Sequence, residues 1–416
     1  MNILFLEMKT TWLEIVAFLT SSFAWATSHG HHPIDNSAVA IQSSVVGLHK
    51  SLVERPFVTG SESNVARFLQ TYLEDIGLTV ELQPVEENRH NVLAYLGDAR
   101  ETRVLVTSHI DTVPPFFPYE RNGEEIWGRG SADAKGSVAA QITAIQLLHQ
   151  GGRLQEGDVA LLFVVGEEKG GTGMKIVNDL GLSWEAVIFG EPTELKLARG
   201  HKGGLGFNLT AIGKAGHSGY PELGRNAIDI LVQGLAKLQG IELPGSEEFG
   251  ATTLNVGTIG GGVAANVIAQ DAFATISVRL AVNNPLRVKE LIEQAVREAS
   301  PWLEVEFSTY AIGPVRIDHD IKGSDSYTFF YLFELTKRNL GFETIVVNYG
   351  TDIPSLKGKH KRYLYGPGSI LVAHSDHECL RVSDLVEAVS GYQILVTEAL
   401  GRSKVIPNTL RKQSFE

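Results

Sequence analysis

The feature that most constrains the fold and function of this chain is an apolar run that ends in a histidine and an aspartate. Residues 104–108 have the pattern of a buried strand, His109 follows it directly, and Asp111 stands two residues further on. Side chains two positions apart on an extended strand point to the same side. The imidazole can therefore bind a metal ion while the carboxylate orients the ring, as metal-binding histidines usually require. A His-x-Asp pair is common by chance, so it gains weight only from other polar residues that share its place in the fold.

Three further acidic turns lie within about 80 residues after this strand. Asp133 stands in a glycine-rich turn before a helix. The adjacent Glu167 and Glu168 follow a strongly apolar strand, and Glu191 follows another short strand. In an open α/β sheet, binding sites form beyond the carboxyl ends of the strands. The sequence therefore predicts that these side chains converge on one crevice with the histidine.

Each acidic turn also has a simpler interpretation. Asp133 could merely cap the following helix, where an acidic residue is favoured in any case. The Glu-Glu-Lys segment at residues 167–169 could be a solvated charged turn. The glycine run after it is not a P-loop, because Lys175 precedes isoleucine rather than serine or threonine. The convergence of several strand ends, rather than any single turn, favours a metal site.

A second histidine site lies near the C-terminus. His374 stands where an apolar segment opens into a loop before the last helix, and His377 and Glu378 follow as alternative ligands or as hydrogen-bond partners. Two histidines and three carboxylates, one of them bridging, would hold two divalent cations about 3.5–4 Å apart. Imidazole and carboxylate ligands suit zinc, although manganese and cobalt also fit.

The order of strand and helix patterns predicts the fold class. Strands and helices alternate in residues 27–199 and again in residues 313–402, which favours an α/β catalytic domain with a mostly parallel sheet. Residues 200–312 follow the order β-α-β-β-α-β, which is the ferredoxin-like motif. We therefore expect an inserted lid domain within a split catalytic domain. We also expect a helix over residues 327–340 and a frayed tail over residues 403–416.

Composition narrows the classes of partner. The 416-residue chain carries a net charge of −12, which argues against non-specific binding to nucleic acid or to anionic membranes. Cys379 is the only cysteine, so neither an intramolecular disulfide nor a thiolate zinc cluster can form.

The N-terminal segment has the pattern of a signal peptide over residues 1–26. Residues 12–25 are largely apolar, and an Ala-Trp-Ala cleavage pattern occupies residues 24–26. A start at Met8 would give a more typical signal peptide. The apolar run is too short and interrupted to span a membrane. We therefore expect a secreted protein, with Asn208 in the sequon Asn-Leu-Thr as a glycosylation site, although so short a motif also occurs by chance.

As a set, these motifs resemble the M20 metallopeptidases, a family that includes glutamate carboxypeptidase, acetylornithine deacetylase and aminoacylase-1. The resemblance covers residues 44–400. The matching motifs are Ser-His-Ile-Asp-Thr-Val-Pro from Ser108, Gly-Arg-Gly-Ser-Ala-Asp-Ala-Lys-Gly from Gly128, Gly-Glu-Glu from Gly166, Gly-Glu-Pro from Gly190, and Ala-His from Ala373 with Glu378.

The resemblance implies a ligand set for two zinc ions. His109 and Glu191 would hold one ion, Glu168 and His374 would hold the other, and Asp133 would bridge both.

The resemblance also implies the catalytic roles. Glu167 would be the general base that deprotonates the attacking water and later protonates the leaving nitrogen. Asp111 would orient His109. A cis peptide bond would follow Asp133.

The lid carries a second set of matching residues. By resemblance, His217 reaches across a dimer to stabilise the oxyanion, Asn266 lines the substrate site, and Arg279 lies near the substrate carboxylate. A donor aimed at the developing alkoxide contributes on the order of 3–4 kcal/mol, and an arginine can bind a carboxylate with two parallel hydrogen bonds. Without the resemblance, His217 would be interpreted as a turn residue and Arg279 as a surface charge. The segment 350–352, Gly-Thr-Asp, resembles a loop that lines the site.

The sequence as a whole predicts a secreted two-metal carboxypeptidase that hydrolyses an amide bond next to a free carboxylate, as a homodimer through the lid. An N-acyl-amino-acid deacylase with the same machinery is the alternative. A metal-retaining binding protein without turnover is a third interpretation, and the intact Glu167 argues against it.

Overall fold

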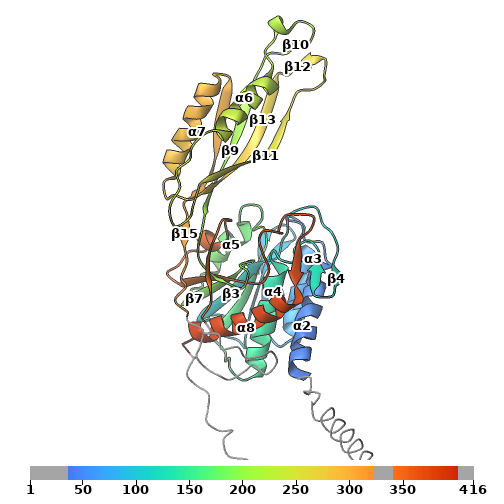
Figure 1. The fold of residues 1–416 in the computed structure, drawn as a ribbon. Coiled ribbons are helices and arrows are strands. Elements are labelled where there is room, and N and C mark those ends of the chain that lie inside the picture. The colour runs from blue at the N-terminus through green and yellow to red at the C-terminus, as the bar shows by residue number, and fades with distance from the viewer. Residues whose placement is uncertain (1–35, 322–340, 402–416) are drawn as a thin grey trace, which may run out of the picture.

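The computed structural model describes residues 36–321 and 341–401, which form two lobes (Figure 1). The catalytic lobe is built on a six-stranded sheet with the order β1-β2-β6-β3-β7-β17. Strands β6, β3, β7 and β17 are parallel, and β2 and β1 extend the sheet antiparallel. The bounds are β1 Thr79–Glu86, β2 Arg89–Tyr95, β3 Val104–His109, β6 Val159–Val164, β7 Ala186–Gly190 and β17 Lys361–Tyr365. The prediction of a mostly parallel α/β sheet is confirmed.

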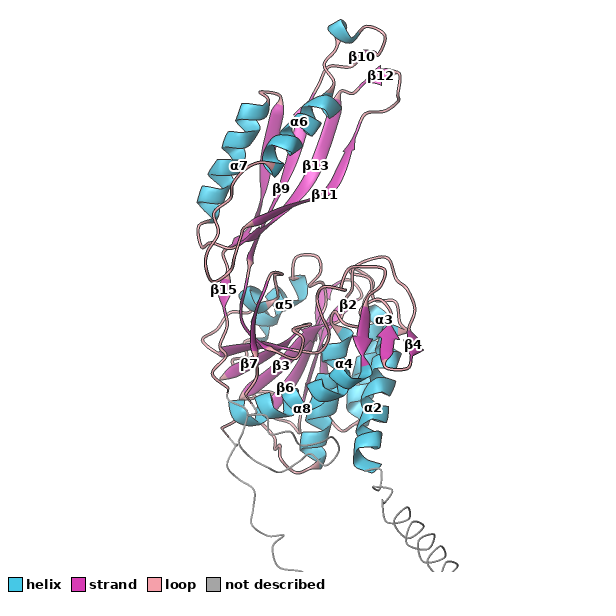
Figure 2. Cartoon of the chain, in the orientation of Figure 1, coloured by secondary structure: helices cyan, strands magenta, loops and turns pink. Residues whose placement is uncertain are grey.

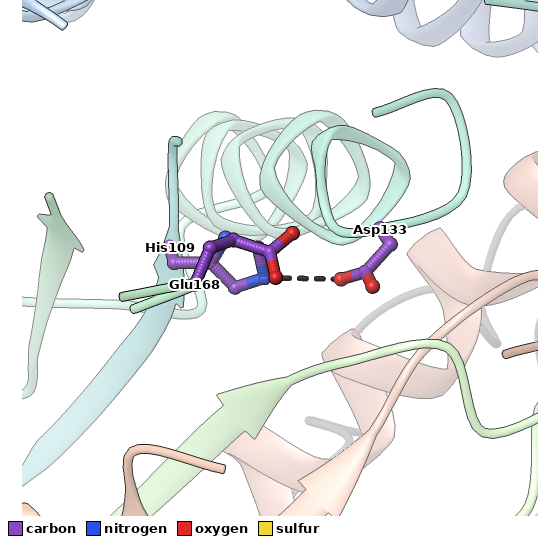
Figure 3. Close-up of side chains that lie close together, drawn as sticks. All are labelled: His109, Asp133 and Glu168. Atoms are coloured by element: carbon purple, nitrogen blue, oxygen red, sulfur yellow. Dashed lines mark hydrogen bonds and ion pairs between the residues drawn. The ribbon is translucent and has the colours of Figure 1, made fainter. Parts of the chain in front are cut away.

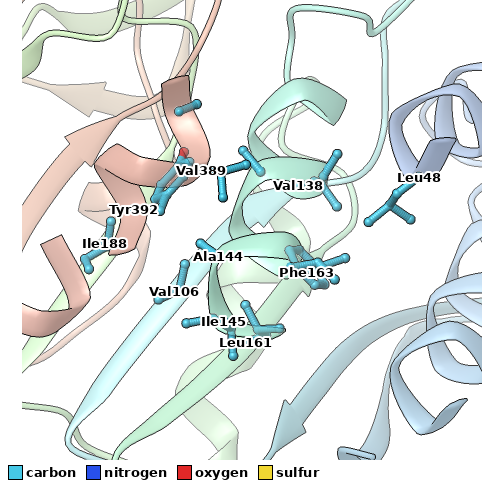
Figure 4. Close-up of a cluster of buried hydrophobic side chains, with 14 of the residues drawn as sticks. Leu48, Val106, Val138, Ala144, Ile145, Leu161, Phe163, Ile188, Val389 and Tyr392 are labelled. Atoms are coloured by element: carbon cyan, nitrogen blue, oxygen red, sulfur yellow. The ribbon is translucent and has the colours of Figure 1, made fainter. Parts of the chain in front are cut away.

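Both faces of this sheet are covered, because successive side chains of its apolar strands alternate between two cores. Val106 packs toward helices α2 (Asn36–Val53), α4 (Lys135–Gln150) and α8 (Val382–Ala399), as Figure 4 shows. Leu105 packs into a second core with residues of α5 (Thr172–Val177). Helix α3 (Ser63–Asp75) contributes to the first core. The buried parallel strands therefore present their carboxyl ends at one edge of a rigid layer.

The lid is a ferredoxin-like domain, as predicted. Its sheet has the order β11-β13-β9-β14 with every pairing antiparallel. Alternate residues of β13 are buried against the two helices, which cover one face of the sheet (Figure 2). The bounds are β9 Gly203–Ile212, α6 Ala227–Gln239, β11 Thr253–Gly261, β13 Asp271–Leu280, α7 Pro285–Ala299 and β14 Leu303–Ile312.

Small sheets stand at the two ends of the lid and beside the main sheet. At the hinge, which is the junction between the lid and the catalytic lobe, β8 (Leu197–His201) pairs with β15 (Val315–Arg316) and with β16 (Thr344–Val347). At the far tip of the lid, β10 (Gly216–His217) pairs with β12 (Val267–Ile268) (Figure 1). In the catalytic lobe, β5 (Glu125–Trp127) pairs with β4 (Glu120–Asn122) and with β18 (Cys379–Arg381).

Helix α2 and strand β17 of the catalytic lobe are among the elements that were not expected. Helix α2 places Val45, Leu48 and Leu52 in the core, but serine and glycine residues between them weaken the helical pattern in the sequence. Strand β17 begins with two charged residues and becomes buried only from Tyr363 onward, so its sequence resembles a loop. The expected helix over residues 327–340 lies outside the described residues. Within residues 36–321 and 341–401, no helix is both long and apolar enough to cross a bilayer.

Candidate active site

The polar residues at the ends of neighbouring strands lie together, because β6, β3 and β7 are adjacent and parallel. Strand β3 ends at His109, and β7 ends directly before Glu191. The turn after β6 carries Glu167 and Glu168. The carboxyl ends of parallel strands meet at one edge of a sheet, where open α/β folds bind ligands.

Asp133 lies at the centre of this group, with its two carboxylate oxygens facing different histidines. Its Oδ1 is 3.1 Å from Nε2 of His109, and its Oδ2 is 3.5 Å from Nε2 of His374. Oε2 of Glu191 is 3.7 Å from the same nitrogen of His109. Oε2 of Glu168 is 3.0 Å from the same nitrogen of His374. The structure thus brings all five residues of the expected ligand set together in two groups that share Asp133.

The donor set fits divalent cations. One ligand atom each from His109, Asp133 and Glu168 lies within 4.8 Å of the others, and the three side chains converge in Figure 3. Oε1 of Glu168 is buried without a hydrogen-bond partner among the described residues. A buried carboxylate oxygen without a partner is costly unless a cation or a donor reaches it.

The pKa shifts of these side chains also favour a bound divalent cation. Burial raises the pKa of Glu191 to about 7, and neighbouring carboxylates add to this effect. Burial and the charge of Asp133 raise the pKa of Glu168. Hydrogen bonds to Asp133 and Glu168 raise the pKa of His374 to about 10. Such shifts reflect too much negative charge in a small buried volume, which a divalent cation would neutralise.

Asp111 orients its neighbours in a different way from the one expected. Nδ1 of His109 donates to the main-chain carbonyl of Asp111 at 3.0 Å, whereas the nearer carboxylate oxygen is 3.7 Å away. That carboxylate instead accepts the backbone N–H groups of Glu167 at 3.0 Å and Glu168 at 3.3 Å, and the hydroxyl of Thr59 at 2.8 Å. Because Nδ1 of His109 donates to this carbonyl, Nε2 is the ring nitrogen that faces the ligand group and can bind a metal. The carboxylate of Asp111 fixes the Glu-Glu turn.

Glu167 is half-buried beside the group. Burial raises its pKa well above the ordinary value, and the charges of Asp352 and Glu191 add to this effect. Asp352 is itself buried, and burial raises its pKa to about 7. The Gly-Thr-Asp loop therefore lies against the site, as expected. The neighbouring Thr351 hydroxyl lies 3.2 Å from Nε2 of His201 at the hinge.

Comparison with known proteins agrees with this geometry. A family model described as "Peptidase dimerisation domain" matches residues 199–304, and one described as "Peptidase family M28" matches residues 91–178. A peptidase M20 domain-containing protein of Schizosaccharomyces pombe is 44% identical over 400 residues, which cover 92% of this chain and 94% of the relative. The chain belongs to the M20 family of metallopeptidases. The predicted resemblance and the prediction of a metallopeptidase enzyme are confirmed.

Other M20 proteins share its length and fold. A probable carboxypeptidase of Aspergillus clavatus is 43% identical, over 86% of this chain and 90% of the relative. An M20 metallo-carboxypeptidase of Sulfolobus solfataricus superposes with a TM-score of 0.66 at 19% identity, covering 86% of this chain and 99% of that one. A dinuclear metal-binding M20 peptidase of Bacillus subtilis gives a TM-score of 0.59 at 18% identity, covering 88% of this chain and 99% of that one. The two-lobed fold is therefore that of M20 peptidases.

The lid residues of this M20 peptidase lie at opposite ends of the lid. Arg279 is exposed near the hinge. Its Nη1 lies beside Gly350, since a Cβ added to that glycine would be 3.2 Å from this nitrogen. His217 and Asn266 lie at the far tip, where the carbonyl of Asn266 accepts the N–H of Ser218 at 3.1 Å. Within one chain, Arg279 lies beside Gly350 of the catalytic lobe, whereas β10, which carries His217, and β12, which follows Asn266, lie at the tip far from that lobe (Figure 1).

The loop that carries the second histidine departs from ordinary backbone geometry. His374 has a φ of 61°, a left-handed value that is uncommon outside glycine and that clusters at functional sites. Its side chain is 52% exposed, so the metal-binding group opens to solvent on this side. His377 is exposed and pairs with Asp376 at 3.0 Å, so it is not part of the ligand group.

The structure decides between the alternatives that the sequence left open for two residues. Asp133 does not cap helix α4, because Ala134 occupies the capping position. The peptide bond between Asp133 and Ala134 is cis, as the resemblance implied. The sequence offered Glu378 as a ligand or as a hydrogen-bond partner, and the structure shows a hydrogen-bond partner. The structure shows it buried against Arg129, 249 positions earlier in the chain, a contact that no local pattern reveals.

Proposed function

We propose that this M20 peptidase is a secreted carboxypeptidase that uses two zinc ions to hydrolyse the amide bond before a free C-terminal carboxylate. The placement of Asp133 supports this most directly, since one oxygen faces His109 and the other faces His374. The glutamates that complete the two groups are expected from the M20 resemblance. The Aspergillus relative named as a probable carboxypeptidase supports the substrate class.

The chemistry divides between the ions and the chain. Two bound cations would polarise the scissile carbonyl and acidify the attacking water. Glu167 accepts the proton of that water and returns it to the leaving nitrogen. Its raised pKa in the half-buried turn suits a group that both accepts and donates a proton. Asp111 keeps Glu167 in place, because it accepts the Glu167 N–H.

The free carboxylate of the substrate has a matching cation at the hinge. Arg279 is exposed, and it forms no ion pair with any carboxylate of the described residues. It lies beside Gly350. The loop that contains Gly350 also carries Asp352, whose charge acts on Glu167. An arginine in this position can bind a carboxylate with two hydrogen bonds and so place the preceding amide at the metal-binding group.

A panel of blocked substrates tests the proposal. We expect N-acylated dipeptides with a free C-terminus to be cleaved far faster than their C-terminal amides, and a chelator to stop the reaction. Arg279→Ala should raise KM for the free acids by roughly 10- to 100-fold, because a charge-assisted hydrogen bond contributes about 1.5–3 kcal/mol. KM for the amides should stay unchanged.

Arg287→Ala on the exposed side of α7 is the matched control, since within residues 36–321 and 341–401 the Arg287 guanidinium forms an ion pair with the neighbouring Glu290 and with no other carboxylate. Equal rates for acids and amides would overturn the carboxypeptidase assignment. A preference for N-acetyl amino acids over all dipeptides would instead identify a deacylase.

We further propose that two chains pair through their lids, so that His217 of each reaches the active site of the other. Strand β10, which carries His217, lies at the tip of the lid, far from the catalytic lobe of its own chain (Figure 1). Large apolar side chains are exposed on the lid, including Leu223 at 62%, Val232 at 53% and Val263 at 87%. Apolar surface of this kind commonly marks an interface. The matching family model is described as a dimerisation domain.

Export rests on the N-terminal sequence, which lies outside the described residues. N-terminal sequencing of protein recovered from culture medium should give a chain that begins at Thr27. A recovered chain that retains Leu13 would contradict export.

The proposed glycosylation site, Asn208, is exposed on the lid face that lacks helices, where its amide oxygen accepts from Thr275 at 3.1 Å. Removal of N-glycans should then lower the mass of the wild type but not of Asn208→Gln.

A further inference from the structure

The loop that carries Asp133 is held by buried side chains from distant parts of the chain. This loop, residues 128–134, joins β5 to α4. Oε1 of Glu378 accepts the backbone N–H groups of Ala132 and Asp133, each at 3.1 Å. One carboxylate oxygen therefore fixes two successive peptide groups, including that of the residue that faces both histidines.

The other oxygen of Glu378 is paired with an arginine in the same loop. Nη1 of Arg129 is 2.8 Å from Oε2 of Glu378, and the two side chains are only 2% and 1% exposed. Nε of Arg129 donates to the carbonyl of Pro115 at 3.1 Å, and the guanidinium lies 4.7 Å from the ring centre of Phe117. Arg129 thus ties Glu378 to a second, separate segment of the lobe.

A third buried group binds the other side of the first of these two peptides, the one between Ser131 and Ala132. Nε2 of His49, on α2, lies 2.8 Å from the carbonyl oxygen of Ser131 and donates to it. Burial lowers the pKa of His49 to about 4, so the ring is neutral near pH 7. The carbonyl of Ser131 and the N–H groups of Ala132 and Asp133 are all bound by side chains that are almost completely buried.

Stability alone is a weak reason for such an arrangement. Removing an arginine and a glutamate from water costs several kcal/mol per ion, and apolar residues of the same size often stabilise a core equally well. What the pair provides is a fixed orientation of the Asp133 backbone. Arg129 holds Oε2 of Glu378, and Oε1 is thereby aimed at the N–H groups of Ala132 and Asp133. A bridging carboxylate must present its two oxygens to two cations, and metal sites tolerate errors of only about 0.5 Å.

We propose that Glu378, neutralised by Arg129, is a positioning residue that sets the two oxygens of Asp133 for a pair of divalent cations. The inference rests on the proposed two-metal function. Glu378 touches neither substrate nor cation in this role. It acts through the two N–H groups that it accepts, and the ion pair with Arg129 holds its carboxylate in that orientation.

The test is metal binding by Glu378→Gln. Glutamine keeps the size of the side chain, but its amide group cannot accept from Arg129 and from both N–H groups at once. We expect metal-stripped protein titrated with Zn²⁺ in a calorimeter to bind roughly 10- to 100-fold more weakly than the wild type. The visible spectrum of the Co²⁺-loaded protein should change as well, and kcat should fall while KM stays constant.

Arg129→Lys is the second variant, and it should retain part of the affinity because it keeps the charge beside Glu378. Glu81→Gln is the control: Glu81 lies on β1, at an edge of the six-stranded sheet, and pairs with Arg100. It should match the wild type in Zn²⁺ affinity and in the Co²⁺ spectrum.

Wild-type affinity and an unchanged Co²⁺ spectrum in folded Glu378→Gln would overturn the positioning role. Equal weakening in Glu81→Gln would overturn it too, because the effect would then be one of general stability. Weakened metal binding in a protein whose wild type cleaves no carboxypeptidase substrate would support the positioning role and contradict the proposed function.

Discussion

Glu167→Gln is expected to lower kcat by about 10²- to 10⁴-fold while the protein keeps both metal ions. Glutamine has the size of glutamate but cannot take a proton from water. The backbone N–H of residue 167 still donates to Asp111, so the turn keeps its shape. Elemental analysis of the purified variant, together with kcat on the best substrate of the panel, measures both parts of the prediction.

The neighbouring carboxylate provides the matched control. Glu168→Gln changes the adjacent position in the same turn, but Glu168 lies 3.0 Å from Nε2 of His374 and belongs to the ligand group. We expect this variant to bind one ion weakly or not at all. If Glu167→Gln were the variant that loses metal, or if it kept wild-type kcat, Glu167 would not be the base.

The ligand group could be predicted from sequence because its members lie at the ends of adjacent strands. His109 and Glu191 end or directly follow β3 and β7, which are neighbours in the sheet, and Glu168 follows β6 on the other side of β3. Each strand is a short apolar run that ends in a polar turn, so the sequence marks both the strand and the end that matters. Parallel pairing then brings the side chains together.

The contacts that hold these residues in place could not be predicted in the same way. Glu378 reaches the N–H of Asp133 across 245 positions of sequence, and His49 reaches the carbonyl of Ser131 across 82. Neither contact leaves a periodic pattern. The carboxylate of Asp111 was expected beside His109, but hydrogen bonds from the next turn compete for it, and the main-chain carbonyl takes its place.

The lid shows a second limit of sequence analysis. A βαββαβ pattern specifies the sheet and its two helices, but it does not say which end of the sheet faces the other lobe. Arg279 ends up near the hinge, because β13 runs from the tip toward it, whereas His217 lies on the short β10 at the tip. One domain thus places Arg279 beside its own catalytic lobe and His217 at the opposite end.

This separation gives the second large expected effect: His217→Ala should lower kcat by about 10²- to 10³-fold, the loss seen when one oxyanion donor is removed, without loss of metal. His217 is exposed, and its Nδ1 accepts the N–H of Gly219 at 3.0 Å, which leaves Nε2 free to donate. His377→Ala is the control, because the ring of that exposed histidine pairs with Asp376 alone among the residues that the structure describes. Metal loss in His217→Ala would contradict a role at the oxyanion.

Mixing two inactive variants tells whether His217 acts on its own chain or on the partner's. In a heterodimer of His217→Ala and Glu167→Gln, the first chain supplies an intact Glu167 and the second supplies an intact His217. If His217 reaches the partner's site, each heterodimer has one complete active site of its two. Random exchange at equal amounts makes half of the dimers heterodimers, so roughly a quarter of wild-type activity should return. If His217 acts within its own chain, no complete site can form and the mixture stays inactive.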